Sequence, residues 1–412
     1  MSAVLEEVNT AAQLVPLSQA VEVNPKLDRS LLSDDLDVSF VPMAAVEALS
    51  GGIDVSTVRK YGEVKKGYTH FRDGDILFAK VTPCMENGKM AIARKLVNGV
   101  GFGSTEFHVL RPRADVDARY IYYFVSSQTF RKEASGHMTG AVGLRRVPSA
   151  YLEEQLISLP SIEQQREIVA EVEKQFSRLD EAVANLQRVK ANLKRYKASV
   201  LNDAVEGRLV EGDYQYEMVK LGSVANVVDP QPSHRTPPKQ ADGVPYIGIG
   251  DVLGNGKVDL QNSRKVAPTV LAEHRARYTL RMGDFIFGKI GTLGKPTLLL
   301  PPYNYTLSAN VVLVQADGVR LLPEYALIFM ESPKLVNMVN RDAKATTQAA
   351  YGIKRMRDLD IELPTIEVQL QITSEVDRRL SLLRRVESEV DINLKRAQAL
   401  RQATLHKAFG PS

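Results

Sequence analysis

Catalysis requires particular residue types at particular spacings, and no stretch of this sequence has the residues and spacing of a catalytic motif. Gly291-Thr292-Leu293-Gly294-Lys295-Pro296-Thr297 resembles a phosphate-binding loop, but its spacing is short and a proline follows the lysine. Asp229-Pro230-Gln231-Pro232 lacks the aromatic residue of the methyltransferase motif Asp-Pro-Pro-aromatic. The six histidines are scattered, without a pair at metal-ligand spacing. The sequence therefore predicts a chain that catalyses nothing by itself.

Several polar loops, in contrast, carry residue types that suit DNA. Residues 65–70 join lysines, an aromatic ring and a hydroxyl, 82–89 supply acidic, amide and basic side chains, and 233–240 again mix bases with hydroxyls. Arg and Lys suit guanine, Asn and Gln suit adenine, and Glu can accept from cytosine, while the remaining bases and hydroxyls suit phosphates. For any single residue, a solvated surface loop is the alternative interpretation.

The residues predicted to contact DNA lie in these loops, in two later polar stretches, and at the ends of two apolar strands. They are Lys65, Lys66, Tyr68, Thr69, His70, Lys80, Thr82, Glu86, Asn87, Lys89, His137, Arg145, Arg146, His234, Arg235, Thr236, Lys239, Lys289, Thr292, Lys295, Arg341, Lys344, Thr346, Thr347, Gln348, Lys354 and Arg355.

The composition is that of a soluble globular protein, with 44% hydrophobic and 25% charged residues. A length of 412 residues is enough for two or three domains. The single cysteine, Cys84, excludes a disulfide framework and a thiolate metal cage. No apolar run reaches the ~18 residues that span a bilayer, and the first residues lack the features of a signal peptide, so we expect a cytoplasmic location. A net charge of +4 permits nucleic-acid binding through local patches without demonstrating it.

The elements that must position these loops include two long helices. The run from Leu159-Pro160-Ser161 to Glu206 contains no glycine and no further proline, and Ser161 is placed as a helix N-cap. Apolar residues recur every seven positions from Val172 to Val200, which is typical of a coiled-coil seam. Such a helix spans roughly 65 Å at about 1.5 Å per residue, so it connects or separates domains.

The same pattern recurs 204 residues later, where Leu363-Pro364-Thr365-Ile366-Glu367 repeats the opening. Residues 15–20 match 219–224 at this offset, and the Gly-Asp turn with its buried strand at 71–80 recurs at 280–289. The pseudo-repeat of about 204 residues therefore covers the whole chain. We expect mixed, β-rich α/β domains alternating with long coiled-coil helices: a first globular domain at 1–158, a first helix at 159–210, a second globular domain at 211–362 and a second helix at 363–412.

The charges of the two helices favour an antiparallel pair. Residues 163–181 hold six acids and three bases, whereas 188–206 hold five bases and two acids, and the second helix follows the same order. An antiparallel arrangement sets acidic halves beside basic halves; two unrelated amphipathic helices are the alternative. The predicted seam consists of Val172, Phe176, Leu179, Val183, Leu186, Val189, Leu193, Tyr196, Val200, Val376, Leu383, Val386, Val390, Leu394 and Leu400.

The duplicated motifs give the chain a resemblance to a known family. Residues 159–168 and 363–372, together with the Gly-Asp motifs at 74–77 and 283–286, resemble the specificity subunit of type I restriction–modification enzymes. The resemblance implies two target-recognition domains that each read half of a bipartite, asymmetric site in double-stranded DNA, spaced by an antiparallel coiled coil. It also implies a role in phage defence with two modification subunits, which bring S-adenosylmethionine for DNA methylation, and two restriction subunits, which use ATP and Mg²⁺. This chain itself is expected to hold no cofactor.

Two other classes of protein remain open from the residues alone. One is a stand-alone DNA-binding regulator with two reading domains, which would bind a specific site and act without catalytic partners. The other is a coiled-coil scaffold without a DNA role, whose behaviour would not depend on salt as DNA binding does.

Overall fold

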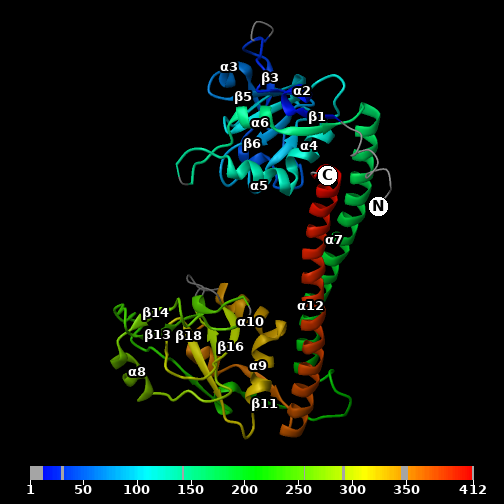
Figure 1. Ribbon diagram of the computed structural model, residues 1–412. Helices are drawn as coiled ribbons and strands as arrows, with labels where there is room; N and C mark the ends of the chain where they lie inside the picture. The colour runs from blue at the N-terminus through cyan, green and yellow to red at the C-terminus, as the bar shows by residue number, and fades with distance from the viewer. Residues whose placement is uncertain are drawn as a thin grey trace. The chain divides into compact units, whose positions relative to one another are not determined.

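The computed structural model describes residues 13–28, 32–141, 143–254, 256–289, 293–344 and 351–410. The chain forms two compact units: unit 1 comprises Met1–Leu186 and Ile392–Ser412, and unit 2 comprises Gln187–Asp391 (Figure 1). Within the described ranges, no helix combines the length and the apolar character needed to cross a membrane.

Unit 1 is built on two four-stranded sheets and a small two-stranded one. The first sheet is antiparallel, and β3 and β8 of the second run parallel. In sheet order, the strands are β2 (Val21–Val23), β9 (Phe107–Pro112), β6 (Ile76–Ala79) and β7 (Met90–Ile92); β4 (Val58–Lys60), β3 (Asp37–Val41), β8 (Val100–Gly103) and β5 (Thr69–Arg72); and β1 (Gln13–Pro16) with β10 (Leu156–Leu159).

Short helices complete unit 1. They are α2 (Leu17–Ala20), η2 (Met43–Ala45), α3 (Tyr61–Val64), η3 (Val97–Gly99), α4 (Ala118–Ser126), α5 (Gln128–Gly136) and α6 (Ser149–Glu154). The main core lies between the first sheet and α4, where Phe78 of β6 and Leu110 of β9 share one cluster with Tyr120 and Ile121. Asp117 begins α4 by accepting a hydrogen bond from the backbone N–H of Arg119.

Unit 2 repeats this framework. Its first sheet runs β12 (Ala225–Val228), β18 (Val311–Ala316), β15 (Phe285–Gly288) and β16 (Gly294–Leu298); its second runs β14 (Arg264–Val266), β13 (Val244–Ile247) and β17 (Thr306–Leu307); and β11 (Glu217–Lys220) pairs with β19 (Asp360–Leu363). The helices are η4 (Leu221–Ser223), η5 (Ile249–Asp251), α8 (Pro268–Arg275), α9 (Pro323–Glu331), α10 (Pro333–Lys344) and α11 (Ile353–Arg357). The predicted fold class, with its internal repeat, is confirmed.

The Gly-Asp motif is a turn in both units, as predicted. Gly74 and Gly283 have φ values of 91° and 90°, which favour glycine because it lacks a Cβ. The following aspartates close the turns, since Asp75 accepts from the backbone N–H of Arg72 at 2.9 Å and Asp284 accepts from that of Arg281 at 2.7 Å.

The two buried aspartates have different partners. The carboxylate of Asp75 accepts two hydrogen bonds from Arg111, from Nε to Oδ1 at 2.8 Å and from Nη2 to Oδ2 at 2.7 Å. Asp284 instead accepts from the neutral amide of Gln315 at 2.6 Å, and burial raises the pKa of Asp284. The two units therefore share the turn, but its aspartate pairs with a charged arginine in unit 1 and with a neutral amide in unit 2.

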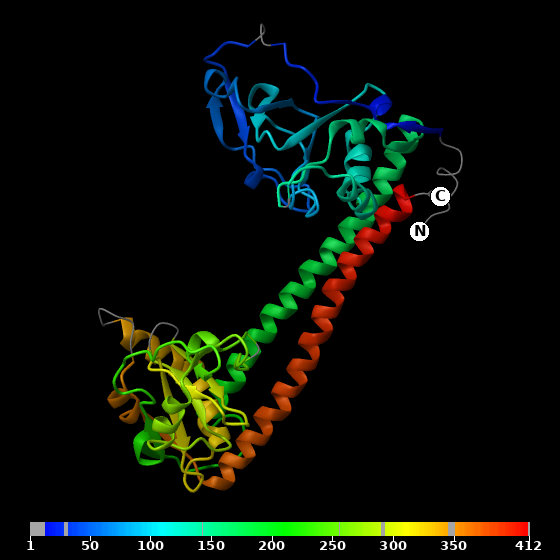
Figure 2. The ribbon, with the colours of Figure 1, turned by 60° about the vertical axis from the view of Figure 1, so that its left-hand side comes forward.

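Two helices of 44 residues, α7 (Ile162–Val205) and α12 (Ile366–Phe409), contribute to both units. Ser161 caps α7, because its Oγ accepts from the Gln164 N–H while the Gln164 side chain accepts from the Ser161 N–H. In unit 1, the start of α7 and the end of α12 join the core of the first sheet, and in unit 2 the end of α7 and the start of α12 do so. The two helices therefore run antiparallel within each unit (Figure 2).

Ion pairs between the helices join acidic and basic halves, as the charge pattern predicted. In unit 1, Arg401 contacts Asp180 at 2.8 Å and lies over the ring of Phe176. In unit 2, Lys190 contacts Asp391 at 2.7 Å. These exposed pairs set orientation more than stability, because solvent screens them.

Four residues predicted for the seam lie outside it. Val189, Tyr196, Val386 and Leu400 are 40%, 47%, 36% and 56% exposed. Val189 and Tyr196 lie three positions after Leu186 and Leu193 of the seven-residue pattern, whereas the contacting face turns inward four positions after such a residue, as at Phe176 after Val172. Such positions hold the half-buried Val183 and Leu394, but also Lys190, which forms an ion pair.

The rest of the predicted seam is at least half-buried. Val172, Phe176, Val200, Val376, Leu383 and Val390 are buried, whereas Leu179, Val183, Leu186, Leu193 and Leu394 are half-buried. Ala397, which was not predicted, continues the seven-residue spacing of α12 and is buried. On α7 the seam is buried only where the helix joins the globular cores, whereas on α12 Leu383, Val390 and Ala397 are buried outside those cores.

Candidate nucleic-acid interface

Equivalent backbone positions form a polar site at the end of a central strand in each unit. Lys80 follows β6; its N–H donates to the Glu106 carbonyl at 2.9 Å, and its own carbonyl accepts from the Val147 N–H at 2.9 Å. Lys289 follows β15 and makes the same two bonds, with Asn310 at 3.0 Å and Tyr351 at 2.8 Å. The framework therefore brings the strand end, the turn before the next strand and a distant loop to one place.

In unit 1, this site carries charged side chains. The carboxylate of Glu106 accepts two hydrogen bonds from the Arg146 guanidinium at 2.8 and 2.7 Å, and this pairing lowers the pKa of Glu106. Thr82 approaches from the neighbouring loop, where its N–H donates to the Arg145 carbonyl at 3.0 Å. Its hydroxyl donates to Glu86 at 3.3 Å. The structure thus brings together five predicted residues: Lys80, Thr82, Glu86, Arg145 and Arg146.

A buried histidine is hydrogen-bonded to Val147, the residue whose N–H donates to the Lys80 carbonyl. His108 on β9 donates from Nε2 to the Val147 carbonyl at 2.8 Å, and Asn24 donates to its Nδ1 at 3.0 Å. Burial lowers the pKa of His108. His137, which was predicted to contact DNA, stacks on Tyr151 with ring centres 4.6 Å apart and donates to the Glu133 carbonyl, so its ring is fixed at the end of α5.

The other predicted residues of unit 1 have separate settings. Lys89 is half-buried and donates one hydrogen bond to the Met43 carbonyl at 3.1 Å, and its predicted contact with DNA stays a prediction. Lys65 pairs with Asp34, and Tyr68 packs edge-on against Phe40, both near the second sheet. The remaining members range from half-buried to exposed: Lys66, Thr69, His70 and Asn87.

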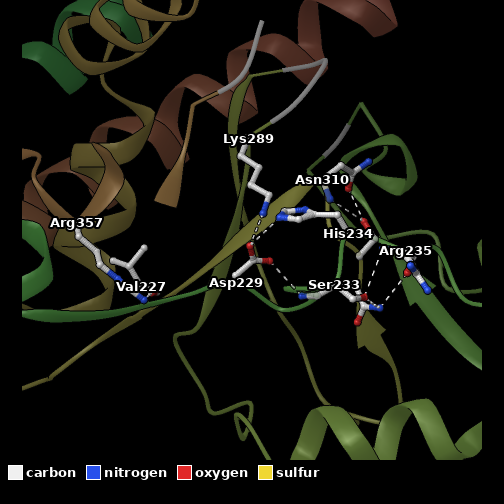
Figure 3. Close-up of polar contacts among 10 residues, drawn as sticks. Val227, Asp229, Ser233, His234, Arg235, Lys289, Asn310 and Arg357 are labelled. Carbon is white, nitrogen blue, oxygen red and sulfur yellow. Dashed lines mark hydrogen bonds and ion pairs between the residues drawn. The ribbon is translucent and has the colours of Figure 1, made fainter. Parts of the chain in front are cut away.

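In unit 2, the lysine of the site, Lys289, is buried and paired, so its predicted contact with DNA stays a prediction that this arrangement does not favour. Lys289 is 4% exposed, and its ammonium donates to Asp229 Oδ2 at 2.9 Å, as Figure 3 shows. A buried ammonium requires such a partner because desolvation is costly. The imidazole of His234 lies beside the pair, with Nε2 3.9 Å from the same carboxylate oxygen.

The loop that follows Asp229 presents four predicted residues. His234, Arg235, Thr236 and Lys239 are all exposed. His234 has a φ of 52°, a conformation that is uncommon for a residue with a side chain. The backbone of this loop is nevertheless tied down, because the amide of Gln231 donates to Ser233 Oγ at 3.0 Å and to the Arg235 carbonyl at 2.9 Å.

The remaining predicted residues of unit 2 are exposed or lie outside the described part. Arg341, Lys354 and Arg355 are exposed, and Arg355 donates to the Asp342 carbonyl at 3.5 Å. Outside the described residues or side chains are Thr292, Lys295, Lys344, Thr346, Thr347 and Gln348. Arg357, by contrast, is structural, since it donates twice to the Val227 carbonyl (Figure 3).

Four residues of the two sites were not predicted: Glu106, Asp229, Gln231 and Asn310. Glu106 and Asn310 are 204 positions apart, each just before a repeated strand, so the repeat offset itself was a usable signal. Asp229 and Gln231 lie in the Asp229-Pro230-Gln231-Pro232 stretch, whose likeness to a methyltransferase motif points to catalysis and not to DNA binding. Among the described residues, no three His, Cys, Asp or Glu side chains gather as a metal site requires.

Comparison with known proteins places these sites in context. Residues 14–195 match the family model of the type I restriction modification DNA specificity domain. The chain is 39% identical over 166 residues to the type I restriction enzyme EcoAI specificity subunit of Escherichia coli, covering 40% of this chain and 28% of that protein. It is 40% identical over 161 residues to the EcoEI specificity subunit of the same species, covering 39% and 27%. The matched region thus spans little more than a quarter of either relative.

Longer matches extend over the rest of the chain. The EcoKI specificity subunit of Escherichia coli strain K12 is 26% identical over 313 residues, which cover 73% of this chain and 67% of that protein. A chain solved in a study of complex assembly in a type I R-M system shares the fold, with a TM-score of 0.75 at 19% identity over 96% of this chain and 97% of that one. The HsdS subunit of Thermoanaerobacter tengcongensis gives a TM-score of 0.57 at 18% identity, covering 97% and 96%. Residues 14–195 thus match the DNA specificity domain of type I restriction–modification systems, and the whole chain shares the fold of the two solved chains.

Proposed function

We propose that this chain is the DNA-recognition subunit of a type I restriction–modification complex. Each globular domain binds one half of a bipartite, asymmetric target in double-stranded DNA. The helices α7 and α12 set the distance between the half-sites and dock two modification subunits. Those subunits supply methyl transfer from S-adenosylmethionine, and two restriction subunits supply ATP- and Mg²⁺-dependent cleavage, so the chain itself contributes recognition and no catalysis.

One observation carries this proposal: the same backbone site bears different side chains in the two units. In unit 1, Lys80 and the Glu106–Arg146 pair lie there, whereas in unit 2 Asn310 lies beside a lysine that Asp229 already neutralises. A repeated framework with divergent polar groups supports two readers of different half-sites. A scaffold without a DNA role would have no reason for this divergence.

The chemistry of the exposed residues suggests how bases are read. Arginines such as Arg145 and Arg235 suit the two acceptors of guanine, and amides such as Asn87 suit adenine. Exposed lysines and hydroxyls suit phosphates, which position the duplex without reading its sequence. Affinity is then expected to fall as salt rises, because phosphate contacts release counterions.

An exchange of one domain tests the proposal directly. Residues 218–360 are replaced by the equivalent domain of a relative, and the chain is expressed with its modification subunit. The methylated motif is then sequenced in the host. We expect one half of the motif to change and the other to persist. If both halves change, or neither does, modular reading by the two domains is refuted.

A second measurement separates this function from a stand-alone regulator. The purified chain and its complex with the modification subunit are compared for binding to a duplex carrying the motif. We expect specific, salt-dependent binding by the complex and methylation only in its presence. A chain that acts on its target in cells that lack the partner subunits would favour the regulator instead.

A further inference from the structure

A buried polar network lies beneath the exposed loop 233–236 of unit 2. His274 of α8 is 1% exposed, and its Nε2 lies 2.6 Å from Oε1 of Gln231. Its Nδ1 contacts the hydroxyl of Thr306 on β17 and lies 3.2 Å from the hydroxyl of Tyr278. These residues come from well-separated parts of the sequence, and their contacts end at the base of the loop.

The Arg235 carbonyl fixes the orientation of the Gln231 amide and, through it, the tautomer of His274. The Arg235 carbonyl can only accept, so the Gln231 amide nitrogen must face it and the Gln231 oxygen must face His274. His274 Nε2 therefore carries the proton, and Nδ1 is left as an acceptor that faces the hydroxyls of Thr306 and Tyr278, which also lie 3.3 Å from each other. Burial lowers the pKa of His274 to about 4, which keeps the ring neutral as this arrangement requires.

The network restrains the backbone from which the exposed side chains project. Gln231 holds both Ser233 and the carbonyl of Arg235, and the residue between them, His234, has the unusual φ of 52°. Asp229 adds a further restraint by accepting from the Gln231 N–H at 3.2 Å. A loop held in this way loses less freedom on binding than a free one, which increases its affinity.

We propose that Gln231 and His274 are positioning residues for recognition of the second half-site, which they support by holding the loop that presents His234 and Arg235 to DNA. This inference rests on the proposed function and adds the residues on which one half of the specificity depends. Neither Gln231 nor His274 is expected to touch DNA itself, because both side chains are buried.

Unit 1 provides the contrast. There the buried histidine, His108 of β9, is hydrogen-bonded to the Asn24 side chain and to the Val147 carbonyl. It therefore does not hold a loop equivalent to 233–236. Disturbing the network of unit 2 should therefore weaken reading of one half-site and leave the other unchanged, which makes the first half-site an internal control.

The test is a double-mutant cycle on the full chain assembled with its modification subunit. The variants are Gln231→Leu, Arg235→Ala and their combination, and the probe is a duplex with the methylated motif. We expect each single variant to lose on the order of tenfold in affinity. The combination should lose little more than Arg235→Ala alone, because Gln231 acts through the loop that carries Arg235.

A second duplex, with its second half-site scrambled, supplies the specificity control. Wild-type and Gln231→Leu complexes should bind it equally, because the positioned loop has nothing to read there. Additive losses in the cycle, an Arg235→Ala complex that binds like wild type, or a Gln231→Leu loss of equal size on both duplexes would overturn the proposal.

Folding is checked by circular dichroism, and a second variant guards against misfolding. If Gln231→Leu does not fold, Gln231→Ala replaces it in the cycle, because it removes the amide without adding apolar volume beside His274. Failure of the proposed function is distinct: the wild-type complex would then bind no bipartite duplex at all, whereas failure of this inference leaves wild-type binding intact.

Discussion

The buried neutral histidine of unit 2 should make this unit sensitive to acid. His274 is 1% exposed, and burial, with a smaller contribution from the charge of Arg277, lowers its pKa from 6.5 to about 4. In the unfolded chain the ring takes up a proton near pH 6.5, but in the folded chain it does so only near pH 4. The unfolded state therefore binds more protons between these values, and the stability of unit 2 falls as the pH falls through this window.

The magnitude follows from the size of the pKa shift. At about 1.4 kcal/mol per pKa unit, His274 contributes about 3 kcal/mol of stability above pH 6.5 that is lost on reaching pH 4. A His274→Gln variant cannot take up this proton. We expect the variant to be less stable than wild type at pH 7, because packing is disturbed, and the difference to shrink by about 3 kcal/mol as the pH approaches 4.

The assay needs a probe confined to unit 2. The chain has no tryptophan, so Tyr303→Trp would introduce a single tryptophan, excited selectively at about 295 nm, beside the apolar core that contains Ile286 and Tyr305. Urea unfolding of this background, with and without His274→Gln, is followed by its fluorescence from pH 7 to pH 4. Subtracting the unfolding free energies of the two proteins at each pH removes the contribution of the carboxylates that both proteins share. Parallel stability curves across this range would refute the reasoning.

Three further outcomes are expected. Arg111→Leu leaves the buried carboxylate of Asp75 unpaired and should destabilise unit 1 by about 3–5 kcal/mol, seen as faster hydrogen exchange in β9. Arg111→Gln should cost less, because it restores one hydrogen bond. On α12, Leu383→Ala should cost about 2–5 kcal/mol in urea unfolding, whereas Val386→Ala should cost under about 0.5 kcal/mol, because only the first side chain is buried. Inserting four residues near Asn185 adds about 6 Å and roughly one turn, so the methylated motif should keep both halves and gain one or two base pairs between them; an active variant with an unchanged gap would contradict the spacing role.

The sequence alone was sufficient for the architecture, because the architecture follows from local patterns. The offset of 204 residues revealed the repeat, the seven-residue apolar spacing revealed α7 and α12, and the Gly-Asp pairs marked turns whose positive φ requires glycine. The charge order along the helices was enough to infer their antiparallel pairing, since it depends only on which halves attract. The same duplicated motifs gave the resemblance to type I specificity subunits, and the family model of their DNA specificity domain matches residues 14–195.

Only the tertiary structure decided which polar residues are presented and which are used internally. Lys80 and Lys289 end equivalent strands, yet Lys289 is neutralised by Asp229, 60 positions away in the sequence. The phase of the helix seam was also decided by packing, because three- and four-residue spacings both place side chains on nearly the same face. The link from His274 to Gln231 could not be read from the sequence, because two distant polar residues become partners only when the fold removes them from water and leaves each the other's hydrogen bond.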